Sequence, residues 1–411
     1  MKKFFKILSC TSLVCSCFIL LAGTIVSSSI PNAYQITENS GMELQGYFPV
    51  TAKTVEGRNL VAAEASMMLN KTYDANILLM NSIPIKTVDV QMVEETKVIP
   101  CGTPFGVKIF TQGVVIVGIS DVKTEQGVSC PAKTAGLRKG DIILSINEQK
   151  VTSNEEIAEI VEKSGGETLI VLARRDNTTF QTELFPIQSF SDGMYKVGIW
   201  VRDSSAGIGT LTFFDPQTNR FAGLGHGICD IDTGELLPLS HGDIVKANIN
   251  GITKGVKGTP GELKGYFSDY HPIGNLQSNS ASGVYGVLKE CPCNHEPIVV
   301  GMKQQVKTGK AQILTTISGE SPQYYDIEIV NVNYNEDVPT KNMVISITDP
   351  RLLEQTGGIV QGMSGSPIIK DGRLIGAVTH VFVNEPTKGY AIFAENMLAY
   401  SRSSAEQRKA S

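Results

Sequence analysis

Short strands separated by glycine-rich turns fill most of this sequence, and few long helical repeats interrupt them. Glycine supplies 40 of the 411 residues, about 10% of the chain against a usual value of about 7%. The clearest strand-like runs after residue 187 lie at 197–201, 209–214, 313–317, 325–330 and 343–347. Runs of this kind, bounded by turn residues, are typical of antiparallel sheets. The pattern predicts a mainly β protein in which residues 187–400 form one antiparallel barrel or a pair of barrels.

The charge balance argues against a nucleic-acid partner. The sequence has 36 Lys and Arg against 41 Asp and Glu, for a net charge of −5, and no long basic run. A protein that binds a phosphate backbone needs a basic footprint, which is missing here. Hydrophobic residues make up 41% of the chain, so it can bury a core. The length predicts two or three folded units.

The first 30 residues have the layout of a secretory leader or of a single membrane-spanning helix. Lys2, Lys3 and Lys6 precede residues 7–30, which contain no charged residue. Such a run is long enough to cross a hydrocarbon core of about 30 Å. Basic residues before a span keep that end in the cytoplasm, so the rest of the chain is expected outside it, either anchored or secreted. Residues 31–100 follow as a connector region, with a strand at 83–90.

Five of the eight cysteines lie outside this leader, at Cys101, Cys130, Cys229, Cys291 and Cys293. An odd number gives no regular disulfide framework. Cys291 and Cys293 precede His295, but the run lacks CxxC spacing and an obvious second half of a metal site. We therefore favour a thiol pair in a surface loop, and expect no metal and no cofactor.

Residues 101–186 resemble a PDZ domain. The resemblance rests on Ala135-Gly-Leu137, Gly140-Asp141 and Ile143 to Asn147, followed by Val151, a helix at 154–163 capped by Asn154, and strands at 168–174 and 179–185. PDZ domains bind an extended peptide by strand addition. The resemblance implies that peptide C-termini bind at a carboxylate-binding turn formed by Thr103, Phe105, Gly106 and Val107. The alternative is a PDZ domain that only packs against its neighbour.

Gly362-Met-Ser364-Gly-Ser-Pro367 is the most informative motif for chemistry. A serine flanked by glycines can expose its hydroxyl at a sharp turn and leave backbone N–H groups free to stabilise an oxyanion. The motif resembles the nucleophile motif Gly-x-Ser-Gly-x-Pro of trypsin-like proteases. It predicts Ser364 as nucleophile and the N–H groups of Gly362 and Ser364 as the oxyanion hole. An ordinary glycine-serine turn is the alternative.

A serine nucleophile needs a base, and histidine has a suitable pKa. Among the five histidines we prefer His226, which lies between two glycines at the end of a predicted strand. His380, in the strand after Ser364, is expected to be a structural residue near the site, and His241, His271 and His295 lie in polar loops. Cys229 is close enough to His226 in sequence that thiol chemistry stays open.

The third member of a triad would orient the imidazole. Asp349 ends a predicted strand and preserves the chain order His, Asp, Ser. Asp230, Asp232 and Asp243 are rivals because they lie closer to His226 in sequence. A strand-end cap is the alternative role for Asp349.

Nearly everything after the leader resembles the stage IV sporulation protein B family, serine endopeptidases of endospore-forming bacteria. The resemblance is carried by residues 83–90, the PDZ signature, residues 200–212, the histidine segment and residues 357–384. It implies a membrane segment at 1–30, the connector at 31–100, the PDZ domain at 101–186, a trypsin-like double β-barrel peptidase domain at 187–400 and a polar tail at 401–411. It assigns the base and the nucleophile to His226 and Ser364, and the acid to Asp349.

The same resemblance implies an exported, membrane-associated protease in the space between the forespore and mother-cell membranes. Such a protease cleaves itself and a membrane-bound regulator, stage IV sporulation protein FA, to trigger pro-sigma-K processing. Two other functions compete with this interpretation. One is a non-enzymatic, membrane-anchored PDZ adaptor with a vestigial serine loop. The other is a general extracytoplasmic quality-control protease of the high-temperature-requirement type, in which the protease precedes the PDZ domain.

Overall fold

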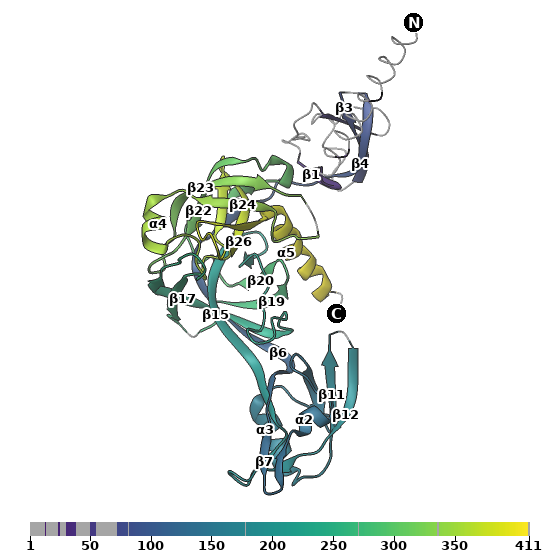
Figure 1. The fold of residues 1–411 in the computed structure, drawn as a ribbon. Coiled ribbons are helices and arrows are strands. Elements are labelled where there is room, and N and C mark those ends of the chain that lie inside the picture. The colour runs from purple at the N-terminus through teal and green to yellow at the C-terminus, as the bar shows by residue number, and fades with distance from the viewer. Residues whose placement is uncertain are drawn as a thin grey trace.

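The computed structural model describes residues 30–37, 50–54, 72–80, 82–176, 178–269, 271–334 and 337–409, together with the single residues 13 and 24. Nearly all of the expected membrane segment lies outside this part of the chain. No helix within the described part is long and apolar enough to cross a membrane. Figure 1 shows a small N-terminal sheet at one end, the PDZ-like unit at the other and a large β unit between them.

Within the expected connector region, the N-terminal unit is a four-stranded sheet. Its strands are β1 (Ala33–Ile36), β2 (Val50–Thr54), β3 (Thr72–Leu79) and β4 (Ile83–Met92), in the order β1-β4-β3-β2. The strand predicted at 83–90 is confirmed as part of β4. Alternate residues point to one face, where Ile77, Val88 and Val90 are buried with the others of a small core. This alternation is what a half-buried sheet requires.

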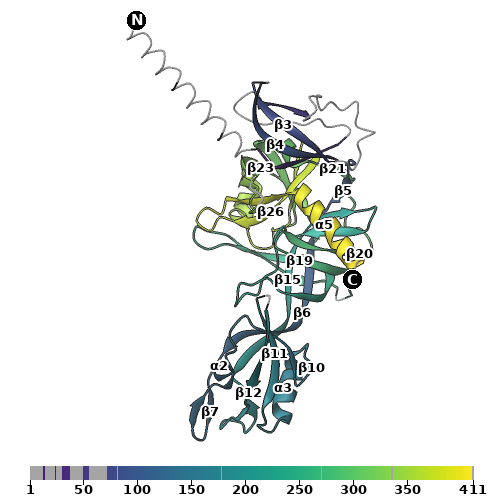
Figure 2. The same ribbon diagram turned by 90° about the vertical axis from the view of Figure 1, so that its right-hand side faces the viewer.

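Two long antiparallel strands connect the other two units. β6 (Pro104–Ile119) pairs with β15 (Ile199–Asp215) over most of their lengths. The first half of β6 and the second half of β15 belong to the large β unit, and the remaining halves belong to the PDZ-like unit, as Figures 1 and 2 show. The PDZ-like unit is therefore an insertion between two neighbouring strands of the same sheet.

The PDZ-like unit packs two helices on short strands. It contains β7 (Val122–Thr124), β8 (Gly127–Ser129), α2 (Pro131–Thr134), β9 (Ile142–Ile146), β10 (Gln149–Lys150), α3 (Asn154–Lys163), β11 (Leu169–Arg175), β12 (Thr178–Leu184), β13 (Ile187–Gln188) and β14 (Tyr195–Lys196). The helix predicted at 154–163 is confirmed, but Ser153 caps it instead of Asn154. The Ser153 hydroxyl accepts from the Glu156 N–H, and the Glu156 carboxylate accepts from the Ser153 N–H, which is a capping box.

The predicted carboxylate-binding turn of the PDZ domain is wrong. Thr103 and the start of β6, including Phe105, Gly106 and Val107, lie in the large β unit, where β6 pairs with β17 (Leu239–Thr253) as well as β15. Phe105 is fully buried and packs edge-to-face on Phe221. A Cβ at Gly106 would press against the Phe267 ring. Neighbouring strands and side chains cover Thr103, Phe105 and Gly106, and Val107 lines a cleft of the large β unit instead of a groove of the PDZ-like unit.

The first half of the large β unit is a closed ring of six strands. The pairing runs β6, β15, β16 (Arg220–Gly223), β20 (Gly283–Leu288), β19 (Gly274–Ser280), β17 and back to β6. β18 (Glu262–Phe267) pairs antiparallel with the second half of β17. Inward-facing side chains such as Leu211, Phe221 and Ile244 fill this first barrel together with Phe105.

The second half is another closed ring of six strands. It runs β22 (Gly309–Thr315), β23 (Gln323–Val332), β24 (Met343–Ile347), β27 (Lys388–Phe393), β26 (Arg373–Val381), β25 (Pro367–Lys370) and back to β22. The strand predicted at 343–347 is confirmed as β24. Isoleucines at 313, 327, 345 and 375 are buried in its core. Two closed barrels in sequence order match the predicted double-barrel architecture.

Several shorter elements join the two barrels. β5 (Lys97–Pro100) and β21 (Ile298–Val300) pair with each other and with strands of both rings. η2 (Lys303–Gln305) and α4 (Pro350–Thr356) lie in connections, and α5 (Ala394–Lys409) packs against β16, β20 and β26. Residues 401–409, predicted as a polar tail, belong to this helix.

Candidate active site

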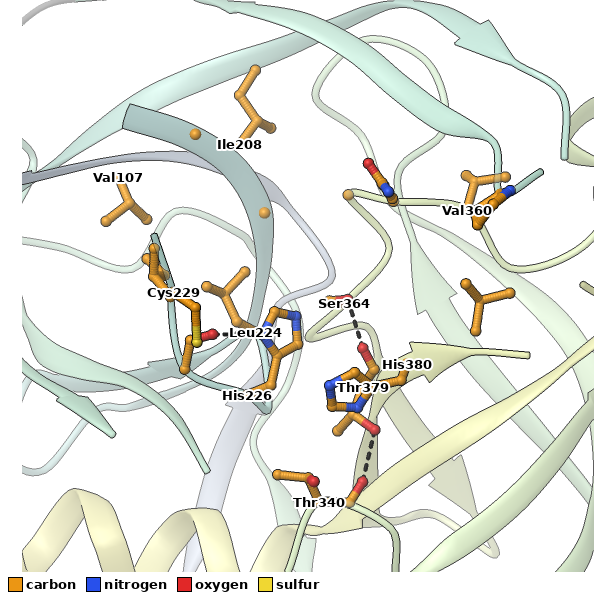
Figure 3. Close-up of a pocket in the computed structure, with 18 of the residues that line it drawn as sticks. Val107, Ile208, Leu224, His226, Cys229, Thr340, Val360, Ser364, Thr379 and His380 are labelled. Atoms are coloured by element: carbon orange, nitrogen blue, oxygen red, sulfur yellow. Dashed lines mark hydrogen bonds between the residues drawn. The ribbon is translucent and has the colours of Figure 1, made fainter. Parts of the chain in front are cut away.

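A cleft of about 820 Å³ lies between the two barrels and contains His226 and Ser364 (Figure 3). Residues of β6 and β15 and the turn after β16 form one wall, and residues 359–364 and β26 form much of the other. Apolar side chains dominate both walls, among them Ile208, Leu224 and Val360. The described lining residues include no Asp, Glu, Lys or Arg. The cleft therefore offers a neutral and largely apolar surface.

A tight turn after β16 directs His226 into this cleft. Leu224 has a φ of 65° and Gly225 a φ of 69°, so both adopt the left-handed conformation. A Cβ at Gly225 would come within 2.9 Å of Cγ2 of Thr379 on β26. Glycine at this position lets the turn of the first barrel approach the second barrel closely. This approach brings His226 to the cleft.

The hydrogen bond of His226 fixes which ring nitrogen can act as a base. Its Nδ1 lies 2.9 Å from the carbonyl oxygen of Gly227. A carbonyl oxygen only accepts, so Nδ1 carries the proton and the Nε2 lone pair is free. Burial lowers the pKa of His226 from its ordinary value of 6.5, which favours the neutral ring at pH 7. The imidazole is thus held as a neutral base.

A second imidazole lies beside the first. The rings of His226 and His380 have centroids 5.0 Å apart, and His380 comes from β26. Desolvation, and then the charges of His226 and Lys341, lower the pKa of His380. Both rings therefore favour the uncharged state, chiefly because burial disfavours a charged imidazole.

Ser364 lies at the turn before β25, and two glycines shape that turn. Gly362 and Gly365 both have a φ of 96°. The Ser364 hydroxyl donates to the backbone carbonyl of Thr379 at 2.8 Å (Figure 3). In this conformation its proton points to the Thr379 carbonyl on β26 and not to His226, so the hydroxyl must reorient before His226 can accept that proton.

The same turn leaves two backbone donors available. Among the described residues, the N–H groups of Gly362 and Ser364 have no backbone acceptor. By contrast, the N–H of Met363 donates to Val360 at 3.1 Å and that of Gly365 to Val378 at 2.8 Å. Two unpaired N–H groups flanking a serine can stabilise negative charge on a substrate oxygen.

Two threonines of β15, which sequence reasoning treated only as strand residues, hold the serine turn in place. The Thr210 hydroxyl donates to the Gly362 carbonyl and the Thr212 hydroxyl to the Gly365 carbonyl, each at 2.7 Å. The N–H of Thr210 donates to the Ser364 carbonyl at 3.2 Å. These bonds fix the turn of the second barrel to a strand of the first. No local signal marks such a contact, since the partners lie about 150 residues apart.

The structure does not bring Asp349 to His226. Asp349 is the N-cap of α4, where its carboxylate accepts from the N–H of Arg351 at 2.9 Å and pairs with the Arg351 guanidinium at 2.8 Å. Those hydrogen bonds with Arg351 lower the pKa of Asp349 to about 2. The reason is local, because Asp followed by Pro favours a helix start at this point. The alternative that the sequence left open, a capping role, describes Asp349 correctly.

The rival acids also have other positions. Asp230 and Asp232 both pair with Arg202, and Asp243 lies on β17. Within the described part of the chain, no carboxylate forms a hydrogen bond or ion pair with His226, and the Gly227 carbonyl takes the orienting position. Cys229 lines the cleft as well, but partial burial raises the pKa of its thiol and so favours the unreactive protonated form.

Comparison with known proteins identifies two regions. The family model for SpoIVB peptidase S55 matches residues 193–398, and a PDZ domain model matches residues 125–175. A putative zinc metalloprotease of Helicobacter pylori is 50% identical over 60 residues, which are 15% of this chain and 17% of that protein. The serine protease HTRA1 of Xenopus laevis is 43% identical over 56 residues, 14% of this chain and 12% of that protein. The chain thus spans less than a fifth of either relative.

Solved structures with partial similarity include two proteases. The active form of the Rv3671c protease from M. tuberculosis is 14% identical with a TM-score of 0.31, covering 49% of this chain and 74% of that one. The HtrA-type protease AlgW with a decapeptide is 14% identical with a TM-score of 0.30, covering 51% and 54%. The PDZ domain of an SdrC-like protein from Listeria monocytogenes is 22% identical with a TM-score of 0.19, covering 22% and 90%.

Proposed function

Because the chain belongs to the SpoIVB peptidase S55 family and is a serine peptidase with a PDZ domain, we propose that Ser364 and His226 carry out its peptide-bond hydrolysis. One observation carries this proposal. The two residues line the same cleft from opposite barrels, with Nε2 of His226 unprotonated and the N–H groups beside Ser364 unpaired. A nucleophile, a base and an oxyanion site are the three parts that acyl transfer requires.

The proposed reaction begins with rotation of the Ser364 hydroxyl away from the Thr379 carbonyl. Nε2 of His226 then removes the hydroxyl proton while Oγ bonds to the scissile carbonyl carbon. The N–H groups of Gly362 and Ser364 stabilise the resulting oxyanion. The imidazolium gives its proton to the leaving amine, and a water molecule hydrolyses the acyl-enzyme by the same steps. The Gly227 carbonyl keeps Nδ1 protonated throughout, in the position that a carboxylate takes in a triad.

The walls of the cleft favour an apolar peptide segment as substrate. Ile208, Leu224 and Val360 lie around the serine, and no charged side chain lines the described cleft. An isolated charge would lose its hydration there without gaining a partner. We therefore expect cleavage beside apolar residues and slow cleavage of peptides that place a charged residue in the cleft.

The family points to sporulation signalling as the setting. We expect the enzyme to cleave itself and a membrane-bound regulator that resembles stage IV sporulation protein FA, and so to trigger pro-sigma-K processing. This function places it outside the cytoplasm, between the forespore and mother-cell membranes, in agreement with the basic and apolar leader of residues 1–30.

The PDZ domain is proposed to bind a peptide end between α3 and the first half of β15, in place of residues 103–107. The Asn154 N–H donates to the Asp203 carboxylate at 3.0 Å, so helix and strand lie side by side. Ile160 of α3 and Val201 of β15 pack against the same core. Strand addition to β15 in this groove is the usual way in which such folds bind a peptide.

Self-cleavage provides the direct test of the proposed reaction. Purified wild-type protein and the Ser364→Ala variant are incubated, and every fragment is identified by N-terminal sequencing. We expect fragments from the wild type and none from Ser364→Ala, with unchanged circular dichroism. Ser191→Ala, at an exposed position of the PDZ-like unit, is the matched control and should cleave like the wild type.

One contact favours an adaptor function, because the Ser364 hydroxyl donates to Thr379 and not to His226. If Ser364 kept that bond, the chain would bind peptides through its PDZ domain without turnover. Equal fragment patterns from the wild type and Ser364→Ala would reject the proposed chemistry.

A further inference from the structure

Three cysteine side chains meet at a point away from the catalytic cleft. Cys101 follows β5, whereas Cys291 and Cys293 lie in the loop between β20 and β21 that joins the two barrels. Their sulfur atoms all lie within 4.8 Å of one another, and those of Cys291 and Cys293 are 3.7 Å apart. None of the three lines the cleft. The sequence showed only half of this cluster, because Cys101 lies far upstream.

Backbone contacts hold the two segments in this arrangement. The Pro100 carbonyl accepts from Nδ1 of His295 at 2.8 Å and faces the Cys293 thiol at 3.7 Å, so the loop is fastened to the residue before Cys101. The Cys101 N–H donates to the Thr212 carbonyl at 3.0 Å. Cys101 is fully buried, and Cys291 and Cys293 are half-buried. The site is therefore formed by the fold and is open to solvent on one side.

The spacing of the sulfur atoms suits a tetrahedral metal ion. Zinc binds thiolates at about 2.3 Å, and two ligands of a regular tetrahedron at that distance lie about 3.8 Å apart. The separation of 3.7 Å between Cys291 and Cys293 agrees with this value. A disulfide requires about 2.05 Å, and it would pair only two of the three thiols. The described cysteines form no disulfide.

We propose that Cys101, Cys291 and Cys293 bind one Zn²⁺ ion as thiolates. Each thiol releases its proton to solvent on binding, and the site then carries one net negative charge, since three thiolates meet one divalent ion. Soft sulfur ligands in tetrahedral geometry select zinc over the hard cations Mg²⁺ and Ca²⁺. The fourth position is left for a solvent molecule, while His295 holds the loop through its bond to the Pro100 carbonyl.

The ion has a structural role at the junction of the barrels. It ties the inter-barrel loop to the corner between β5 and β6. The Cys101 N–H donates a hydrogen bond to the Thr212 carbonyl. The Thr212 hydroxyl in turn donates to the Gly365 carbonyl of the serine turn. Binding of zinc therefore stabilises the strand on which the serine turn is held.

Metal content and cobalt absorption test the site without relying on activity. The full chain is expressed with zinc, purified without chelator and analysed for metal. We expect about one zinc ion per chain. Co²⁺ added to the zinc-free protein should give intense thiolate-to-cobalt charge-transfer absorption. Chelator should lower the melting temperature of the wild type.

Cys291→Ser and Cys293→Ser are the variants of choice, since half-buried positions tolerate the change better than the fully buried Cys101. Each should lose the bound zinc and weaken the cobalt band, and chelator should no longer shift the melting temperature. Cys130→Ser, at a cysteine in the PDZ-like unit, is the control and should keep the zinc. A wild-type protein without zinc or cobalt absorption, a disulfide within the cluster, or equal zinc loss in the control would overturn the proposal.

Discussion

At the scale of single residues, the state of His226 determines how activity should depend on pH. A general base works when it is unprotonated, so activity rises with pH through the pKa of the base. Burial lowers that pKa from 6.5. We therefore expect kcat/KM for a fluorogenic apolar peptide to rise below pH 6.5 and to reach a plateau by neutral pH. A midpoint above 6.5 would mean that a group other than a buried neutral imidazole acts as the base.

Gly365 is the residue on which the geometry of the serine turn depends most. Its φ of 96° is strained for any other residue, and a Cβ there would overlap the carbonyl oxygen of Thr210. Gly365→Ala should displace the turn and abolish activity, with a stability loss above the ~1–2 kcal/mol expected for left-handed backbone alone. Thermal unfolding and peptide hydrolysis measure the two effects.

Gly372→Ala is a control that introduces the strain of a left-handed backbone without a clash between the new Cβ and a neighbouring residue. Gly372 has a φ of 72°, but no heavy atom lies within 4 Å of the position that an added Cβ would take. This control should lose about 1 kcal/mol and keep its activity. Equal behaviour of the two variants would mean that contact with Thr210 does not position the serine.

At the scale of elements, the start of α4 decides between two roles for Asp349. If Asp349 caps the helix, Asp349→Asn keeps the cap and retains most activity, whereas Asp349→Ala loses about 0.5–2 kcal/mol of stability. If Asp349 instead orients His226, the Asn variant should lose about 10⁴-fold in kcat. We expect the first result, from chemical denaturation and initial rates of both variants.

Local pattern was sufficient to predict individual strands and the helix at 154–163, because alternation and capping residues act within a few positions. It does not predict that β6 is one continuous strand from Pro104 to Ile119. The strand in fact continues through Gly113, whose φ is 84° and where a Cβ would press against the Ile143 carbonyl. Residues 103–107 suit a PDZ turn and a barrel strand equally well, and only pairing with the distant β17 decides between them.

The site was predictable to a similar extent. The glycines around His226 and Ser364 marked both residues, since turns that expose a side chain need them. The orienting carbonyl of Gly227 and the threonines of β15 have no sequence signal of their own. Asp349 misled because an Asp before Pro can cap a helix or complete a triad, and only its contact with Arg351 distinguishes the two.

At the scale of the whole molecule, the domains share strands and cannot be separated at the predicted boundary. β6 closes the first barrel between β15 and β17, yet it lies before residue 187. A fragment of residues 187–411 should therefore fail to fold, because the open barrel exposes Phe221 and other core residues to water. A fragment beginning at residue 94, before β5, retains β6 and should fold. Solubility and circular dichroism of both fragments test this, and a folded, active 187–411 fragment would show that β6 is dispensable.

The central claim is that Ser364 is a nucleophile activated by His226 across the cleft between the barrels. It is tested most directly by labelling the full chain with a fluorophosphonate, followed by peptide mapping. We predict that the wild type is labelled on Ser364 alone, that His226→Ala slows this labelling strongly, and that Ser364→Ala abolishes it. Labelling at another residue, or labelling of Ser364 at an equal rate without His226, would contradict the account.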